Sequence, residues 1–291
     1  MNPRMVVVYR DSEYTELLNT HSTHGAAAFF LKSRDQDIDT VLGRHHLQER
    51  ALEAVSGLTP RSWRRARVRR AELDRFLFGP DDLIVAVGQD GLVANTAKYL
   101  EAQPVIGVNP DPTRFDGVLV RHSVDGFGHA LQEALIGRVQ RRTMVEARTD
   151  DGQTLLALNE IFLGQRTHQS ARYQICWDGC RELQSSSGLI VATGTGSTGW
   201  ARSIHQSRRC ELPLPTPDAP ELVFFVREAF PSRATGTALV EGRIGDGDAL
   251  TVTSHMDDGV LFGDGLETDC ITLRWSQEVR IRRSERALHL V

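Results

Sequence analysis

The chain has 291 residues, which is enough for two domains, and its formal net charge is −4. This charge gives no global argument for binding nucleic acid or a membrane surface, and no apolar run approaches the roughly 20 residues that a membrane helix needs. The N-terminal sequence MNPRMVVVYR has too short an apolar core for a signal peptide. We therefore expect a cytoplasmic protein with no nucleic-acid or membrane partner.

The first part of the chain has the pattern of an α/β domain. Apolar runs at 5–9, 82–87 and 104–108 predict buried strands, and a helix is expected at 92–101 between the last two. This β-α-β order is typical of a parallel sheet with right-handed crossovers. The earlier helices are expected at 25–32 and 38–58.

One segment of this part, RSWRRARVRR at residues 61–70, is far more basic than the rest of the chain. We interpret it as a solvated surface around a short strand at 66–69. The alternative is an anion patch that binds phosphates.

The remainder of the chain has a different character. After a helix expected at 126–137, short alternating runs separated by turns predict an antiparallel β domain. We place an α/β domain at 1–118 and an antiparallel β-rich domain at 119–291. The expected strands lie at 142–147, 155–162, 170–177, 189–193, 222–227, 237–243, 249–254, 259–262, 270–275 and 279–283.

The cysteines give little sign of a metal site. Cys176 and Cys180 are spaced C-x3-C, but no matching Cys or His pair accompanies them. This is a weak zinc signal, so reduced structural thiols are the preferred interpretation and we expect no metal-ligating residues in the chain.

The first candidate site is Gly88-Gln89-Asp90-Gly91, which follows the buried strand at 82–87 and precedes a helix. Glycines let the backbone approach a phosphate chain, and open α/β sheets bind ligands at the carboxyl ends of their strands. The alternative is a tight strand-to-helix turn with a solvent-facing aspartate.

The second candidate is Asn159-Glu160 in the apolar run LLALNEIFL. Burying this pair is costly without hydrogen bonds, and together an amide and a carboxylate can bind ribose hydroxyls. The alternative is a strand end or a bulge at which both side chains are in water.

The third candidate is LIVATGTGSTGW, residues 189–200, in which Gly194, Gly196 and Gly199 match G-x-G-x-x-G. We do not interpret it as a Rossmann fingerprint, because a short polar helix and a Pro-rich loop follow it instead of a second strand that ends in an acid. Its glycines and hydroxyls still suit a nucleotide. A flexible hairpin loop is the alternative.

Taken together, the three motifs resemble the NAD kinase family. Its members carry strand-GGDG-helix, an Asn-Glu pair, and a Thr/Gly/Ser-rich loop that ends in an aromatic residue, in this order. The flanking phrases PVIGVNPDP (104–112), SSGLIVATGTGSTGW (186–200) and FFVREAFPSR (224–233) match as well. The form TGTGS and the phrase VNPDP are closer to the mitochondrial-type branch.

The resemblance implies an N-terminal α/β domain with a parallel sheet, an antiparallel β-rich C-terminal domain that binds NAD, and a homodimer or homotetramer. It also implies transfer of the γ-phosphate of ATP, with Mg²⁺, to the 2′-hydroxyl of the adenosine ribose of NAD(H). The choices between NAD and NADH, and between ATP and polyphosphate, stay open.

The resemblance also implies a role for each matching residue. Asp90 would be the general base, and Gly88 and Gly91 would let the loop lie against phosphates. Asn159 and Glu160 would hold ribose and phosphate groups of NAD. Ser187 stands where many members have Asp. The residues of the third motif that would line the cofactor pocket are Thr195, Thr198, Gly199, Trp200 and Ser203.

The chain departs from the family at Gln89 and Leu92, where GGDGT is expected. A Gln that needed a positive φ would cost about 1 kcal/mol. The alternative function is therefore a catalytically weak NAD(P)-binding or regulatory homologue. A further alternative is a kinase of the same superfamily that acts on a lipid or nucleoside hydroxyl, although Asn159-Glu160 and Thr198 favour a dinucleotide.

Overall fold

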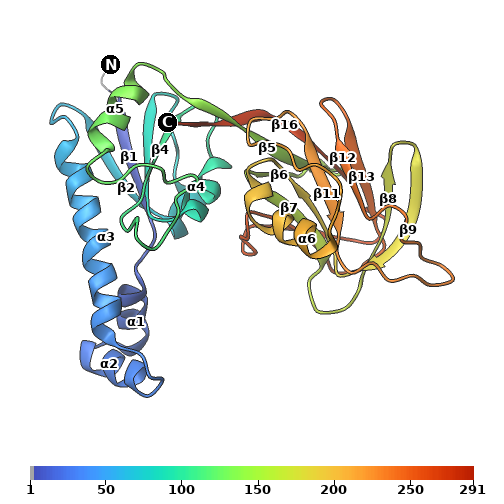
Figure 1. Cartoon of the computed structure of the whole chain (residues 1–291), viewed down its shortest axis with the longest axis horizontal. Helices are drawn as coiled ribbons and strands as arrows, with labels where there is room; N and C mark the ends of the chain where they lie inside the picture. Colours follow the sequence, from blue (N-terminus) through green and yellow to red (C-terminus); the bar gives the residue numbers. More distant parts are fainter. Residues whose placement is uncertain (1–2) are drawn as a thin grey trace. The chain divides into compact units, whose positions relative to one another are not determined.

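The computed structural model describes residues 3–291, which form two compact units (Figure 1). Unit 1 comprises the chain up to Gln140 together with His289–Val291, and unit 2 comprises Arg141–Leu288. The predicted division after residue 118 lies earlier than this one. Helix α5 (Phe127–Leu135) explains the difference, because its buried residues are part of the core of unit 1.

Unit 1 contains the predicted parallel sheet. The strand order is β2-β1-β3-β4, and neighbouring strands pair in parallel. The last residues of β16 (Glu278–Leu290) add a parallel pairing to β4. The other strands are β1 (Arg4–Tyr9), β2 (Arg64–Arg69), β3 (Asp82–Val87) and β4 (Pro104–Val108).

Helices connect these strands. The chain passes from β1 to β2 through α1 (Glu13–His21), α2 (His24–Lys32) and α3 (Ile38–Leu58), and α3 has the predicted bounds. Figure 1 shows α1 and α2 beside the end of α3 that extends away from the sheet. The connection from β2 to β3 contains the 3-10 helix η1 (Arg70–Arg75), and α4 (Asp90–Ala97) joins β3 to β4.

The strand order itself marks a ligand site. The connection that leaves β1 runs to β2 on one side, whereas the connection that leaves β3 runs to β4 on the other side. The two connections therefore diverge beyond the carboxyl ends of β1 and β3. Open α/β sheets bind ligands in the crevice that such a divergence leaves.

Unit 2 is built from two sheets, and all of its strand pairs with a described register are antiparallel, as expected. One sheet has the order β16-β13-β8-β9 with β5 and β6 attached, and the other has the order β12-β11-β10-β7-β14-β15. A single core lies between them, with Val252 and Ile281 from the first sheet and Val191 and Phe224 from the second. The bounds are β5 (Gln140–Thr149), β6 (Thr154–Ala157), β7 (Glu160–Gln165), β8 (Ala171–Trp177), β9 (Cys180–Ser186), β10 (Leu189–Ala192), η2 (Gly196–Thr198), α6 (Trp200–Arg208), β11 (Leu222–Val226), β12 (Glu241–Ile244), β13 (Ala249–Ser254), β14 (Gly259–Gly263) and β15 (Cys270–Leu273).

The cysteines are unpaired, and the C-x3-C spacing belongs to the β8–β9 hairpin. Cys180 pairs across the hairpin with Trp177, so Cys176 points to the opposite face of the sheet. Within residues 3–291, no cluster of three or more His, Cys, Asp or Glu side chains is placed to hold a metal ion. The same part of the chain has no helix that is long and apolar enough to span a membrane.

Candidate functional site

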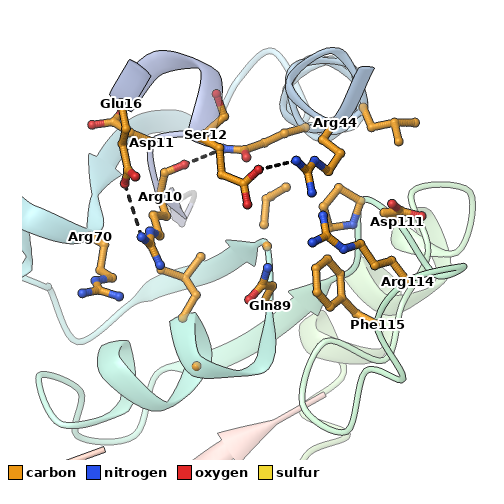
Figure 2. Close-up of a pocket in the computed structure, with 18 residues that line it drawn as sticks. Arg10, Asp11, Ser12, Glu16, Arg44, Arg70, Gln89, Asp111, Arg114 and Phe115 are labelled. Carbon is orange, nitrogen blue, oxygen red and sulfur yellow. Dashed lines mark hydrogen bonds and ion pairs between the residues drawn. The ribbon is translucent and has the colours of Figure 1, made fainter. Parts of the chain in front are cut away.

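A cavity of about 210 Å³ lies in unit 1 at the carboxyl ends of β1 and β3, where the strand order predicts a ligand site (Figure 2). Its walls come from the segment after β1, from α1 and α3, from the turn between β3 and α4, and from the loop after β4. The lining residues include Arg10, Asp11, Ser12, Glu13, Glu16, Arg44, Arg70, Gly88, Gln89, Gly91, Leu92, Pro110, Asp111, Arg114 and Phe115.

The turn between β3 and α4 forms the part of the wall that carries the first motif. The backbone N–H of Gly88 donates to the carbonyl oxygen of Val108 (3.0 Å), which ties the turn to β4. A Cβ atom on Gly88 would lie 3.2 Å from Cδ2 of Leu92, so a side chain there would be crowded. Gln89 has φ −105° and precedes the helix without a side-chain cap bond. Because this φ is negative, Gln89 does not carry the backbone strain that a positive φ would impose on it.

Asp90 is held by the loop after β4. Its Oδ1 accepts hydrogen bonds from the N–H groups of Leu119 (2.8 Å) and Val120 (2.9 Å), and its Oδ2 accepts one from Val118 (3.0 Å). The loop lies close because Gly107 has no side chain: a Cβ atom there would come within 2.2 Å of the carbonyl oxygen of Leu119. An ionised carboxylate has about four acceptor sites, so one site on Oδ2 is left for a further partner. Asp90 does not line the cavity, whereas Gln89 and Gly91 do.

The cavity has cationic residues that the preferred interpretation of the sequence did not assign to a site; only Arg70 belonged to the anion patch considered as the alternative. Figure 2 shows the guanidinium groups of Arg10, Arg44, Arg70 and Arg114 around Gln89. Arg10 pairs with Glu16 (3.3 Å) and Arg44 with Glu13 (2.6 Å). Arg70 belongs to the basic segment, which was the only sequence signal for any of the four.

The buried Asn109 shapes the loop that carries Arg114. Its Nδ2 donates to the carbonyl oxygen of Phe115 (2.9 Å), and its Oδ1 accepts from the N–H of Asp111 (3.0 Å). The phrase VNPDP therefore begins a loop that presents Pro110, Asp111 and Phe115 to the cavity.

In unit 2 the second and third motifs come together. β7 begins at Glu160 and pairs with β10, which ends just before Thr193. The N–H of Thr193 donates to the carbonyl oxygen of Asn159 (2.9 Å), and the Thr193 hydroxyl donates to that of Leu158 (2.6 Å). A Cβ atom on Gly196 would come within 2.2 Å of the Asn159 carbonyl oxygen. The absence of a side chain at Gly196 therefore allows the backbone of this loop to contact the backbone of Asn159. Because β10 is antiparallel to both neighbours, the motif does not open a Rossmann unit.

Asp264 joins this group and was missed by our sequence reasoning. Its carboxylate accepts from the N–H groups of Leu158 (2.9 Å) and Asn159 (2.6 Å), and its own N–H donates to the carbonyl oxygen of Glu160 (3.1 Å). Burial, and then the nearby charge of Asp264, raise the pKa of the Glu160 carboxyl to about 7. The sequence signal was weak: Asp264 lies between two glycines at a turn.

The remaining predicted residues differ in their exposure and place. Thr198, Gly199 and Ser203 are exposed around the start of α6. Trp200 stacks on Phe162, with a centroid distance of 5.8 Å and an interplanar angle of 14°, and the guanidinium of Arg227 lies 5.0 Å from its ring centroid.

Thr195 and Ser187, the remaining predicted residues, differ in exposure. Thr195 is buried, and its hydroxyl has no hydrogen-bond partner within residues 3–291. Ser187 precedes β10, whereas Thr193 follows it, so Ser187 lies at the opposite end of this strand from Asn159 and Glu160.

The chain is similar in sequence to several NAD kinases, although no family model matches it. NAD kinase 2, mitochondrial, of Rattus norvegicus is 31% identical over 216 residues, which cover 57% of this chain and 51% of the relative. The human mitochondrial protein is 27% identical over 66% of this chain and 62% of its own length. The chain thus spans about half to three-fifths of these relatives. The NAD kinase of Chlorobium phaeobacteroides is 29% identical over 72% of this chain and 71% of its own.

Solved structures show the same fold. An NAD kinase from Archaeoglobus fulgidus in complex with ATP aligns with a TM-score of 0.59 at 19% identity, over 99% of this chain and 92% of its own. Yeast NADH kinase complexed with NADH aligns with a TM-score of 0.62 at 15% identity, over 100% and 84%. The chain is therefore a relative of the NAD kinases in sequence and has the NAD kinase fold, a parallel α/β unit combined with an antiparallel β-rich unit.

Proposed function

We propose that the protein is an NAD kinase, which transfers the γ-phosphate of ATP to the 2′-hydroxyl of the adenosine ribose of NAD(H). The observation that carries this proposal is the group formed in unit 2 by Asn159, Glu160 and the loop that begins at Thr193. The N–H of Thr193 donates to the carbonyl oxygen of Asn159, and β10, which ends just before Thr193, pairs with β7 at Glu160. An amide and a carboxyl side chain whose backbone is held beside a hydroxyl-rich loop are suited to bind the hydroxyls of a dinucleotide. The relatives named NAD kinase support the same reaction.

In this proposal unit 2 holds the acceptor. Asn159 and Glu160 bind ribose hydroxyls, and the exposed Thr198 and Ser203 offer hydroxyl groups to the adenosine half. Trp200 presents an aromatic surface that is already ordered by Phe162 and Arg227. Thr195 and Gly199 shape the loop. We assign Ser187 only a peripheral contact with the cofactor, because it lies at the other end of β10.

Unit 1 holds the donor. Gly88 and Gly91 let the turn approach phosphates at the N-terminus of α4, since the first N–H groups of a helix lack intrahelical partners; that of Leu92 already donates to the carbonyl oxygen of Gln89 (2.9 Å). Asp90 takes the proton of the 2′-hydroxyl on its remaining Oδ2 acceptor site. The three backbone hydrogen bonds fix the orientation of this carboxylate, and a positioned general base contributes about a hundredfold or more to the rate.

We also propose that Mg²⁺ enters with ATP. Protein sites usually bind this ion through one or two carboxylates together with substrate phosphates. Asp111, which lines the cavity, is the carboxylate that would hold it. When bound, the ion neutralises charge on the phosphates.

A second candidate is an NAD(P)-binding homologue with little catalysis, and one observation favours it. Three of the acceptor sites of Asp90 already serve the loop at 118–120, so this acid has a structural reason to be present in a protein that is not an enzyme.

One assay distinguishes the two candidates. Purified protein is incubated with ATP, Mg²⁺ and NAD or NADH, and NADP(H) formation is followed, while calorimetry measures NAD binding. The kinase proposal expects product from at least one acceptor. Normal NAD binding without product would establish the binding protein instead, and absence of both would remove the dinucleotide from either proposal.

We further propose a cytoplasmic homodimer or homotetramer. Four unpaired cysteines are consistent with a reducing compartment, and the resemblance to NAD kinases implies an oligomer. Light scattering coupled to gel filtration gives the number of subunits, and a monomeric mass at micromolar concentration would contradict this proposal.

A further inference from the structure

We infer that Arg70 and Arg114 hold the polyphosphate of the donor in the cavity of unit 1. This inference rests on the proposed function, because it assigns residues outside the three motifs to the donor of the same reaction. Both side chains line the cavity, and they come from different elements: Arg70 begins η1 after the edge strand β2, and Arg114 lies on the loop after β4.

The ion pairs of the cavity distinguish these two arginines from the other two. Glu16 and Glu13 of α1 pair with Arg10 and Arg44 and offset their charges. In residues 3–291, neither Arg70 nor Arg114 has an acidic partner, although Arg114 lies 5.3 Å from the ring centroid of Phe115. Their charges are therefore available to an anion.

Other arginines of the basic segment at 61–70 do not line the cavity. Arg65 donates to the carbonyl oxygen of Thr59 (2.8 Å), Arg67 donates to the Ser56 hydroxyl (3.0 Å), and Arg69 pairs with Glu72 (2.8 Å). These three arginines anchor the edge of the sheet. Arg64 is exposed and does not line the cavity. Arg70 alone carries the charge of this segment into the cavity, where it is half-buried.

The arrangement favours an extended anion over a single phosphate. In Figure 2, Gln89 and the start of α4 lie between Arg70 and Arg114. Each guanidinium can bind phosphate oxygens in a bidentate manner, and backbone N–H groups at the start of α4 can donate to phosphate oxygens between them. A linear chain of phosphates can contact all three groups. Pro110 and Phe115 add an apolar surface to the same cavity, which a base or ribose can cover.

The test compares Arg70→Ala, Arg114→Ala and the matched control Arg64→Ala, each in the full chain. Calorimetry measures binding of tripolyphosphate without NAD, and steady-state kinetics gives the KM for ATP and the kcat. Because a charge-assisted hydrogen bond is lost, we expect the tripolyphosphate Kd and the KM for ATP to rise about tenfold or more in each cavity variant. The kcat at saturating ATP should change much less, and Arg64→Ala should match the wild type.

Several outcomes overturn the inference. Equal Kd and KM values in Arg70→Ala, Arg114→Ala and Arg64→Ala would do so, as would a wild type that does not bind tripolyphosphate. Arg70→Lys replaces the alanine variant if that one does not fold, and it should bind more weakly than the wild type because lysine cannot bind in a bidentate manner. A protein that forms no NADP(H) yet binds tripolyphosphate through Arg70 refutes the proposed function and leaves this inference standing.

Discussion

The backbone N–H of Asp264 donates to the carbonyl oxygen of Glu160 (3.1 Å), so two acidic residues that lie far apart in the sequence meet at the start of β7. Burial of Glu160 and the charge of Asp264 together raise the pKa of the Glu160 carboxyl from its ordinary value of 4.5 to about 7. The folded protein therefore keeps a proton on Glu160 at pH values at which the unfolded chain has lost it.

This difference predicts how stability depends on pH. Between pH 4.5 and about 7 the folded state binds more protons than the unfolded state, so the free energy of unfolding falls as pH rises, by about 3 kcal/mol at most. Glu160→Gln removes this dependence. On going from pH 5 to pH 8, the thermal denaturation midpoint of the variant should therefore rise relative to that of the wild type. The exposed Glu267→Gln is the control, and an equal difference at both pH values for Glu160→Gln would contradict the prediction.

Asp90→Asn tests both roles that the structure gives to this residue. If Asp90 is the general base, the kcat should fall about a hundredfold or more, because an amide cannot accept the proton. The variant should also lose about 1–2 kcal/mol of stability, since the amide nitrogen cannot accept the N–H bonds made by the loop at 118–120. Activity and thermal denaturation are measured in parallel with Asp116→Asn, an exposed acid nearby. A stability loss with unchanged kcat would leave Asp90 only the structural role.

Much of the fold could be predicted from local pattern. The apolar runs at 82–87 and 104–108 coincide with β3 and β4, and the predicted helix at 38–58 has the bounds of α3. Helix α1 was not predicted, because it has no buried residue and hence no apolar periodicity to recognise. Strand β16 extends to Leu290, well beyond the predicted end at 283, because its last residues pair with β4, a partner distant in sequence.

The candidate sites show the same limit. The motifs identified Asp90, Asn159 and Glu160, but the partners of these residues come from distant segments. Asp264 reaches Asn159 only because β14 pairs with β7, and this register is not encoded near either residue. The loop at 118–120 reaches Asp90 because Gly107 leaves room for it. Local sequence motifs can therefore identify some residues of a site, but the partners of these residues depend on strand pairing and backbone contacts between distant segments.

Gly107→Ala should displace this loop. A Cβ atom at this position would lie 2.2 Å from the Leu119 carbonyl oxygen, a backbone atom that cannot move aside without shifting the loop. We expect a stability loss of about 1–3 kcal/mol from overpacking, with weaker protection of the Leu119 and Val120 amides in hydrogen exchange. Gly128→Ala in α5 is the matched control, because nothing lies within 4 Å of its Cβ position. That change should stabilise the protein, by up to about 1 kcal/mol. Equal effects of the two substitutions would refute this account.

Leu92→Thr restores the residue expected in the family, but it should lower the free energy of unfolding. Leu92 is 5% exposed, and its Cδ2 fills the space above Gly88. Replacing it with the smaller, polar Thr should cost about 1–3 kcal/mol through lost burial and a buried hydroxyl.

Gln89→Gly is the companion to this change. Gln89 is exposed, has φ −105° and makes no cap bond, so its replacement relieves no strain and should shift stability by less than about 1 kcal/mol. The substitution should instead change the KM for ATP, because Gln89 lines the donor cavity. Thermal denaturation and donor kinetics of both variants check these expectations. A stabilised Leu92→Thr protein, or a Gln89→Gly protein whose denaturation midpoint rises by several degrees, would show that the turn is strained after all.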